Sequence, residues 1–488
     1  MLDDPMTTAD MVGWALGVLL PLVQVLGVLS AVDAVMHSRT PQGSAAWVVA
    51  LVLLPVVTLP LYWVFGRSRF EGYVEDVRQF DDDVTARLDR AQRALDHWEV
   101  PPETASDERT ESELRGFASL SRLPFLRGNS LRLLVDGKAT FDAILAAIDA
   151  AEHTVVAQFY IVRDDRLGRR FQRSLLDAAA RGVRVFFVYD GVGSHSLPRR
   201  YVRTLRQAGV GVNEFSGDRG WLGRFRINFR NHRKIVVVDG QRAFVGGLNV
   251  GDEYLGLDPS LSPWRDTHLA VEGPAAQALQ LSFARDWFYG RGEIPDLPWG
   301  LAGSDRDQAA LVVASGPADR VETAGLLYAQ AITAAESRVW IASPYFVPDG
   351  MVLGALQSAA LRGVDVRVIM PRMADSWMFR FVPYAFLPDV ERVGVKVYLY
   401  EDGFMHQKVI LVDDDYAAVG TANFDNRSFR LNFEVTCLAH DAPFCADVEA
   451  MLAADLARST RLTEEDLKAQ SFPFRLAAQG TRLLAPVL

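Results

Sequence analysis

His232-Arg-Lys-Ile-Val-Val-Val-Asp239 and His406-Gln-Lys-Val-Ile-Leu-Val-Asp413 are two copies of one pattern, His-x-Lys-x-x-x-x-Asp. With 8 His and 5 Lys in 488 residues, about 0.007 such matches are expected by chance, so the duplication is informative. The apolar run after each lysine predicts a buried strand. Histidine and lysine two positions apart on a strand point to the same face, so each pair is suited to binding one phosphate.

The pattern lies within a longer internal repeat. In each half an apolar stretch precedes a helix that ends in Arg-Gly-Val, and a second apolar stretch follows. Such runs alternating with helices predict an α/β fold with largely buried sheets. We expect two duplicated halves, 130–300 and 301–460, each a β-sheet flanked by helices, with one site at their seam. The matching stretches are Thr154–Tyr160 with Arg338–Tyr345, Arg181–Val183 with Arg362–Val364, and Arg184–Val188 with Asp365–Ile369.

The composition excludes some classes of protein. The net charge is −10, whereas a protein that coats nucleic acid needs an excess of Lys and Arg. The two cysteines, Cys437 and Cys445, are too few for a disulfide framework or a cysteine-rich zinc site. Hydrophobic residues make up 49% of the chain and are concentrated at the N-terminus, which indicates membrane segments rather than a larger core.

Residues 1–67 are predicted to form a transmembrane helical hairpin. Residues 11–32 and 43–66 are uncharged, and each is long enough to cross a hydrocarbon core, which takes about 20 helical residues. Aromatic residues lie near their ends, as at a membrane interface. A cleaved signal peptide is the alternative for the first span, but the first ten residues carry three aspartates and no basic residue.

The positive charges around the hairpin predict its orientation. A hairpin places both termini on one side of the membrane. Arg67, Arg69 and Arg78 follow the second span, whereas the turn holds only Arg39. The positive-inside rule therefore places the catalytic body in the cytoplasm.

Two further segments flank the repeat. Residues 68–129 are predicted to hold a charged helix, at 70–98, and then a polar linker from Pro101 to Glu113. Residues 461–488 are predicted to form a C-terminal tail.

The paired motifs resemble those of the phospholipase D superfamily, and the resemblance covers essentially all of the internal repeat. The two spans, the turn at Arg39, Trp47 and the tail Arg482–Leu488 resemble the bacterial cardiolipin synthase branch. This implies a multi-pass protein of the bacterial inner membrane that joins two phosphatidylglycerol molecules through a phosphohistidine intermediate, giving cardiolipin and glycerol. Many members carry Ser after the turn glycine, where this chain has Gly247 and Thr421, so one hydroxyl contact is in question.

The motif residues suit phosphodiester exchange, which needs a nucleophile, a proton donor and stabilisation of an anionic transition state. Two histidines can divide the first two tasks, because imidazole titrates near neutral pH. The resemblance favours His232 as the nucleophile and His406 as the acid and base, although the residues themselves do not order them. Lysine and asparagine side chains would bind the non-bridging oxygens, and no metal or other cofactor is expected. The candidate catalytic residues are His232, Lys234, Asp239, His406, Lys408 and Asp413, and the candidate phosphate-binding residues are Asn249 and Asn423.

Each histidine also needs an acceptor for its second ring nitrogen, as in a catalytic triad. The candidates are Asp266 and Glu434, each on the strand after its motif, and similar positions in the superfamily play this role. The alternative is that both are ordinary surface acids; perturbed acids cluster at functional sites, which favours the first interpretation. We expect Asp239 and Asp413 to close the turn after each motif strand.

Two stretches that mix aromatic residues with arginine, Trp221–Arg230 and Ser376–Leu387, flank the motifs. This composition suits an anionic membrane surface or a single-stranded nucleic-acid groove, and core helices are the alternative. We favour membrane contact, because the hairpin already holds the body at the bilayer. His195, on a predicted loop at a strand end, is a further candidate for substrate contact. The expected partners are membrane phospholipids and the bilayer, without nucleic acid; a homo-oligomer stays open.

Three other functions would use or contain the same motifs. A phospholipase D would transfer the phosphatidyl group to water and release phosphatidic acid, a nuclease would cleave nucleic acid, and an inactive scaffold would do neither. The spans and the two chain ends favour phosphatidyl transfer, and excluding water would favour it over hydrolysis. The net charge counts against the nuclease, and two intact motifs count against the scaffold. Phosphatidylethanolamine could replace one phosphatidylglycerol.

Overall fold

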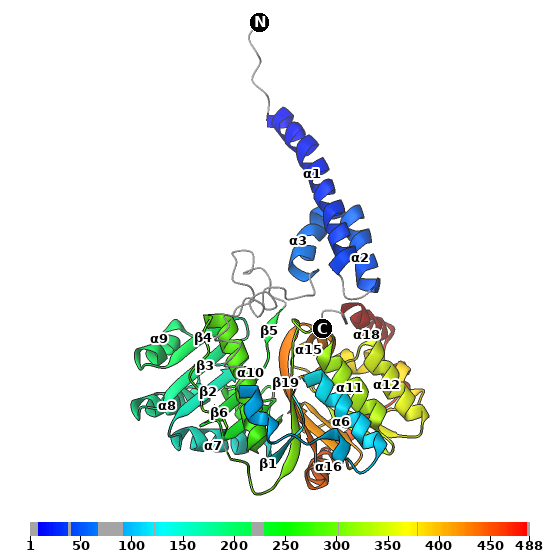
Figure 1. Cartoon of the computed structure of the whole chain (residues 1–488). Helices are drawn as coiled ribbons and strands as arrows, with labels where there is room; N and C mark the ends of the chain where they lie inside the picture. The colour runs from blue at the N-terminus through cyan, green and yellow to red at the C-terminus, as the bar shows by residue number, and fades with distance from the viewer. Residues whose placement is uncertain are drawn as a thin grey trace. The chain divides into compact units, whose positions relative to one another are not determined.

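The computed structural model describes residues 8–37, 41–66, 91–121, 123–215, 229–300, 302–377 and 379–485. The chain divides into two compact units (Figure 1). The first contains the N-terminal helices, and the second contains the described residues from 91 onwards except Phe229.

The first unit contains α1 (Thr8–His37), α2 (Pro41–Leu53) and α3 (Pro55–Phe65). In the described part of the chain, one helical segment, Gly17–His37, is long and apolar enough to cross a membrane. The predicted second span over 43–66 is divided between α2 and α3, and its crossing of a membrane stays a prediction. The helix breaks at Leu54 (φ −134°, ψ 52°), because Pro55 lacks an N–H and disfavours the helical conformation in the residue before it.

Helices α1 and α2 approach closely where a glycine allows it. A Cβ atom on Gly27 would lie 2.6 Å from the Leu51 carbonyl oxygen, so only glycine fits there without a shift. Ala31, Ala34 and Leu51 are buried together with side chains of α3. The Tyr62 hydroxyl of α3 donates a hydrogen bond of 2.7 Å to the carboxylate of Asp33 on α1, which fixes the third helix against the first.

The second unit is built on one 16-stranded sheet made of two halves with the same strand order. The first half runs β1-β9-β7-β6-β2-β3-β4, and the second runs β10-β19-β17-β16-β11-β13-β14, with β20 added at its edge. The first half contains β1 (Leu126–Val135), α7 (Asp136–Asp149), β2 (Thr154–Phe159), α8 (Arg166–Ala180), β3 (Arg184–Asp190), α9 (Arg199–Gln207), β4 (Gly211–Phe215), β5 (Arg230–Asn231), β6 (Ile235–Val238), β7 (Arg242–Gly246), η3 (Asp252–Leu255), β8 (Trp264–Arg265), β9 (Thr267–Glu272) and α10 (Pro274–Arg291).

The second half repeats these elements with small additions. It contains β10 (Gln308–Ser315), α11 (Thr323–Ala334), β11 (Arg338–Ala342), β12 (Phe346–Val347), α12 (Gly350–Leu361), β13 (Asp365–Pro371), α13 (Val382–Ala385), α14 (Leu387–Glu391), β14 (Lys396–Tyr400), β15 (Phe404–Met405), β16 (Val409–Val412), β17 (Tyr416–Gly420), β18 (Phe424–Asp425), α15 (Asn426–Arg430), β19 (Asn432–His440), α16 (Ala442–Leu456), β20 (Ser459–Leu462), α17 (Glu464–Lys468) and α18 (Phe472–Leu484). The antiparallel pair β1–β10 joins the halves. The predicted duplicated α/β fold is confirmed.

Equivalent local signals start and stop the crossover helices in the two halves. Asp165 caps α8 by accepting a hydrogen bond from the Gly168 N–H, and Asp349 caps α12 in the same way. Each helix ends two residues before the glycine of the repeated Arg-Gly-Val sequence. Gly182 has φ +89° and Gly363 has φ +93°, a left-handed conformation that favours glycine and turns the chain into the next strand.

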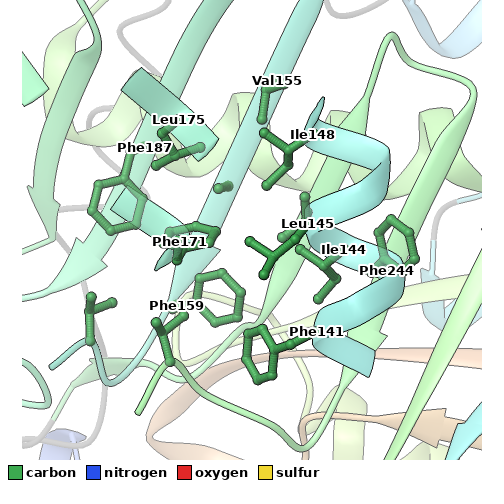
Figure 2. Close-up of a cluster of buried hydrophobic side chains, with 14 of the residues drawn as sticks. Phe141, Ile144, Leu145, Ile148, Val155, Phe159, Phe171, Leu175, Phe187 and Phe244 are labelled. Atoms are coloured by element: carbon green, nitrogen blue, oxygen red, sulfur yellow. The ribbon is translucent and has the colours of Figure 1, made fainter. Parts of the chain in front are cut away.

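Apolar side chains of the helices and strands form the core of the first half. Figure 2 shows Phe141 and Ile144 of α7 and Phe171 of α8 packed with Val155 of β2 and Phe187 of β3. All six residues of β2 are buried, including the polar Thr154 and Gln158, as expected for a largely buried sheet. This packing holds the strand ends that carry the site.

The expected linker up to Glu113 is partly helical. Helix α6 (Glu108–Ser121) begins within it and buries Leu114 and Phe117. Strand β1 begins at Leu126, inside the segment 68–129 that was expected to precede the first half. Several predictions lie largely or wholly outside the described residues: those on the charged helix 70–98, Trp221–Arg230, Arg39, Arg67, Arg69, Arg78 and the last three residues of the tail.

The motif aspartates close turns, as expected. The Asp413 carboxylate accepts hydrogen bonds of 2.7–2.8 Å from the backbone N–H groups of Glu336, Ser337 and Arg338. Asp239 accepts from three equivalent N–H groups ahead of β2. Both have a positive φ, 54° for Asp239 and 49° for Asp413, which aspartate tolerates better than most residues.

We predict that Asp413→Ala destabilises the protein by about 2–4 kcal/mol, because it leaves three N–H groups without a charged acceptor. Asp413→Asn is the matched control: it keeps one oxygen acceptor and tolerates the left-handed backbone, so it should lose less. Thermal unfolding of the detergent-solubilised full chain measures both. An unchanged Tm in Asp413→Ala would contradict the turn-closing role.

Candidate active site

Two short strands carry the motif histidines across the seam between the halves. Strand β5, just before His232, pairs in parallel with β19 of the second half. Strand β15, just before His406, pairs in parallel with β8 of the first half. The His232 N–H donates to the Phe433 carbonyl at 2.9 Å, and the His406 N–H donates to the Arg265 carbonyl at 2.8 Å. Each histidine therefore lies against the other half of the fold.

This crossing pairs each histidine with an acid of the other half. His232 Nδ1 lies 3.0 Å from both carboxylate oxygens of Glu434. His406 Nδ1 lies 2.9 Å from Oδ2 of Asp266. All four side chains are buried, which excludes the alternative that the two acids are ordinary surface residues.

The Glu434 carboxylate is held by three further donors. The Thr421 hydroxyl donates to it at 2.6 Å, the Ser428 hydroxyl at 2.9 Å and the Asn432 amide at 3.2 Å. Thr421 is the residue after the turn glycine, so the second half keeps a hydroxyl contact there. Burial acts to raise the pKa of Glu434, but His232, the positive charge of Lys234 and the hydrogen bond from Thr421 outweigh it and lower the pKa below its usual value.

Asp266 is held differently. It accepts from the Thr267 N–H at 2.7 Å and from the Trp264 indole at 3.3 Å. A Cβ atom on Gly247 would lie 2.0 Å from an Asp266 oxygen, so the carboxylate occupies the space that a side chain would need. Burial raises the pKa of Asp266, and the positive charge of Lys408 opposes this. The second half therefore has the hydroxyl contact, from Thr421 to its carboxylate. In the first half, the Asp266 carboxylate itself occupies the space beside Gly247.

Both histidines are neutral at pH 7. Burial lowers the pKa of His232 to about 4, Lys234 contributes in the same direction, and the attraction of Glu434 only partly opposes them. Burial and the two lysines lower the pKa of His406 well below its usual value. With Nδ1–H donating to a carboxylate, each neutral ring has its lone pair on Nε2, the atom that can attack phosphorus or accept a proton.

The motif lysines lie beside their own histidines. Lys234 Nζ donates to the His232 carbonyl, and Lys408 Nζ donates to the His406 carbonyl, each at 2.6 Å. Burial lowers the pKa of Lys234 to about 7 and that of Lys408 to about 8. Each ammonium lowers the pKa of both histidines, so the two motifs share one electrostatic site.

The two asparagines are buried near the ends of their glycine turns. The Asn249 amide donates to the Tyr254 hydroxyl at 3.1 Å and accepts from the Ile161 N–H at 3.0 Å. Part of its hydrogen-bonding capacity is therefore already used within the protein. The Asn423 side-chain oxygen is buried without a hydrogen-bond partner among the described residues. Asp239 and Asp413 bind backbone amides at the far ends of their strands.

A buried carboxylate behind each motif was not predicted. Asp286 of α10 accepts from Arg233 Nη1 at 2.6 Å and from Asn231 at 2.8 Å. Asp455 of α16 accepts from Gln407 at 2.8 Å and from both Nε and Nη2 of Arg265 at 2.8 Å. Each thus binds the middle residue of a His-x-Lys motif. The sequence signal is weak, because both helices carry other polar or charged residues as well.

Aromatic rings line both histidines. The Tyr160 ring contacts His232 with centroids 4.9 Å apart, and the Trp264 and Phe404 rings lie 5.3 and 6.0 Å from His406. His195 is exposed on the loop after β3 and contacts the Val192 carbonyl of the same loop.

The chain is similar to known proteins in both sequence and fold. The family model described as "Cardiolipin synthase, PLD-like domain" matches residues 144–287 and 328–456, and the "Phospholipase_D-nuclease N-terminal" model matches 25–67. Cardiolipin synthase A of Pseudomonas aeruginosa is 49% identical over 476 residues, covering 97% of this chain and 96% of that protein. Cardiolipin synthase A of Pseudomonas fluorescens is 46% identical over 474 residues, covering 97% and 98%.

Solved structures support the fold. The phosphatidylserine synthase of Haemophilus influenzae Rd KW20 has a TM-score of 0.59 at 15% identity and covers 77% of this chain and 100% of that chain. The duplicated sheet, the two motifs and the relatives of nearly full length agree, and the chain belongs to the cardiolipin synthase family of phospholipase D-like enzymes.

Proposed function

We propose that this site transfers a phosphatidyl group from one phosphatidylglycerol to another through a phosphohistidine, with His232 as the nucleophile and His406 as the acid and base. The observation that carries the proposal is the pair of imidazole–carboxylate contacts made across the seam. They hold two Nε2 atoms, with two ammonium groups beside them, in one buried site.

In the first step, the Nε2 lone pair of His232 forms a bond to phosphorus while the bond from phosphorus to the glycerol oxygen breaks. His406, protonated at Nε2 once the anionic substrate is bound, gives its proton to that oxygen, and glycerol leaves. The ammonium groups of Lys234 and Lys408, with Asn249 and Asn423, hold the non-bridging oxygens, where negative charge builds up.

In the second step, His406 is neutral again and takes the proton of the terminal hydroxyl of a second phosphatidylglycerol. The freed oxygen attacks phosphorus, the bond to His232 Nε2 breaks, and cardiolipin forms. The proton gained by His406 serves the next cycle, so one residue is acid and then base. Water in the acceptor position would give phosphatidic acid instead.

We also propose that the first unit anchors the protein in the bacterial inner membrane by α1, with α2 and α3 completing a multi-pass anchor and the catalytic body in the cytoplasm. Supporting this, α1 contains a membrane-length apolar segment, and Tyr62 ties α3 to it. The two phospholipase D-like halves, 130–300 and 301–460, would then form one catalytic body facing the cytoplasmic leaflet.

We predict that the purified full chain converts radiolabelled phosphatidylglycerol into cardiolipin and glycerol, and that His232→Ala and His406→Ala each reduce turnover at least about 1,000-fold. His153→Ala is the matched control and should keep near-full activity, because His153 is an exposed histidine just before β2 and outside the two motifs. Thin-layer chromatography separates the products. If phosphatidic acid were the main product, the enzyme would be a hydrolase and not a phosphatidyltransferase.

The order of the two histidines can be tested with a donor whose leaving group needs no proton. With phosphatidyl-p-nitrophenol labelled in its phosphatidyl group, we expect His406→Ala to release a single burst of p-nitrophenolate, because His232 can still attack. The labelled phosphatidyl group should then stay bound to the protein. We expect no burst from His232→Ala. The opposite pattern would exchange the two roles.

The lysine pKa values predict a basic limit to catalysis. Since Lys234 and Lys408 lose their charge in the free enzyme at pH about 7 and about 8, kcat/KM should fall as the pH rises through this range. Lys408→Arg keeps one charge and should remove the second ionisation, so that kcat/KM falls in one step near pH 7 instead of two steps, whereas Lys468→Arg, an exposed position, should keep both steps. A wild-type kcat/KM that stays constant up to pH 9 would contradict the assignment.

A further inference from the structure

The C-terminal helix α18 has two apolar sides, and the second unit covers only one of them. On the inner side, the Phe474 ring contacts Phe381 and Tyr384, each with centroids 5.1 Å apart. Ala478 and Thr481 are buried on the same side. A surface helix of a globular protein usually has a single apolar stripe that faces the core. The second stripe therefore needs another explanation.

The outer side of α18 exposes three large apolar side chains. Phe472 is 68% exposed, Leu476 61% and Leu483 84%. Steps of four and seven residues bring side chains back to the same side of a helix, so these three form one stripe. Exposed apolar side chains that gather in this way mark an interaction site.

An exposed tryptophan extends the stripe. Trp377 is 79% exposed, and its ring lies 6.4 Å from that of Phe381. Phe381 in turn contacts Phe474 of α18, so Trp377 lies beside the helix. Tryptophan is the residue that most favours the boundary between lipid and water. We call Phe472, Leu476, Leu483 and Trp377 together the interfacial patch.

The loop that carries Trp377 also reaches the candidate active site. Phe379 stacks on Tyr345 with ring centroids 4.0 Å apart, just beyond the end of β11. Two residues earlier, the Ser343 hydroxyl accepts a hydrogen bond from the N–H of Phe424, the residue after the phosphate-binding candidate Asn423. Figure 1 shows α18 at the same end of the second unit as α15 and β5, which adjoin the site.

The charged residues within the segments that carry the interfacial patch are arginines, whereas Asp375 and Asp389, the acids that flank the stretch 376–387, accept from Tyr345 and pair with Arg482, respectively. The charged residues of α18 are Arg475 and Arg482, and that of the stretch 376–387 is Arg380, without any acid in either segment. Arg482 pairs with Asp389, whereas Arg475 and Arg380 are exposed. Aromatic and aliphatic side chains with an arginine rim are the composition that an anionic lipid surface selects.

We propose that the interfacial patch inserts into the headgroup region of an anionic bilayer, so that the active site opens towards the membrane that contains its substrate. The identity of the lipid rests on the proposed function. A second copy of the chain fits less well, because stable dimers bury roughly 20–30 residues on each side, and four side chains fall far short of that. An interfacial helix needs only a short apolar stripe.

The test compares labels at two equally apolar, exposed leucines of the full chain. Leu476→Cys carries a fluorescent label in the interfacial patch, and Leu361→Cys is the matched control, because Leu361 is 72% exposed at the end of α12, just before the start of β13. That end of the sheet is opposite to the strand ends that carry the site. The native cysteines, Cys437 and Cys445, are buried.

In vesicles of phosphatidylglycerol and phosphatidylcholine, a lipid-borne quencher should reach the label at 476, and aqueous iodide should not. The label at 361 should show the reverse. Equal exposure of both labels to iodide would overturn the proposal. So would a label at 476 that is shielded from iodide without being reached by the lipid-borne quencher, since that result indicates a second copy.

Activity gives an independent measurement. Leu476→Asp and Trp377→Asp should lower cardiolipin formation from vesicles about tenfold and leave turnover of detergent-dispersed, short-chain phosphatidylglycerol unchanged, with Leu361→Asp neutral in both. Equal losses with both substrates would contradict the proposal. If the wild-type chain makes no cardiolipin from either substrate, the proposed function fails while the labelling result still decides the membrane contact.

Discussion

The contacts of His232 with Glu434 and of His406 with Asp266 are the constraint on which the second unit depends. Each carboxylate is removed from water, which is costly unless donors surround it. In both pairs the histidine and the acid come from different halves. One half alone would bury an imidazole without its acceptor and an acid without its donor. The duplication is therefore a condition of the chemistry, and the antiparallel pair β1–β10 sets its geometry.

The charge balance of the site explains how one of two histidines with low pKa values can act as a general acid. With neutral imidazoles, the ammonium groups of Lys234 and Lys408 balance the carboxylates of Asp266 and Glu434. A bound phosphodiester adds one negative charge to a site that excludes water, and the nearest group able to take up a proton is an imidazole. On the proposed mechanism, substrate binding thus creates the imidazolium that the first step consumes.

The sequence predicts the duplicated fold and the motif residues, because short sequence patterns determine both. These patterns are apolar runs, Arg-Gly-Val helix ends and a rare spacing of His and Lys. It does not predict which acid meets which histidine, because β5 and β15 have two residues each and no periodicity of their own. The break at Leu54 is missed for another reason. A proline within an apolar run is compatible with either a kinked helix or two helices, and packing decides between them.

The two halves share a fold but differ in how they hold the acid, and this difference favours the proposed order of the histidines. Glu434 has three donors besides His232, which keep it ionised, so the proton stays on His232 Nδ1 and the lone pair stays on Nε2, as a nucleophile requires. Burial raises the pKa of Asp266, and the positive charge of Lys408 opposes this. The protonation of such a carboxylate depends more strongly on the charge of its histidine. This dependence suits a histidine that gains and loses a proton in each cycle. On the proposed order of the histidines, a symmetric fold provides a site with two distinct roles.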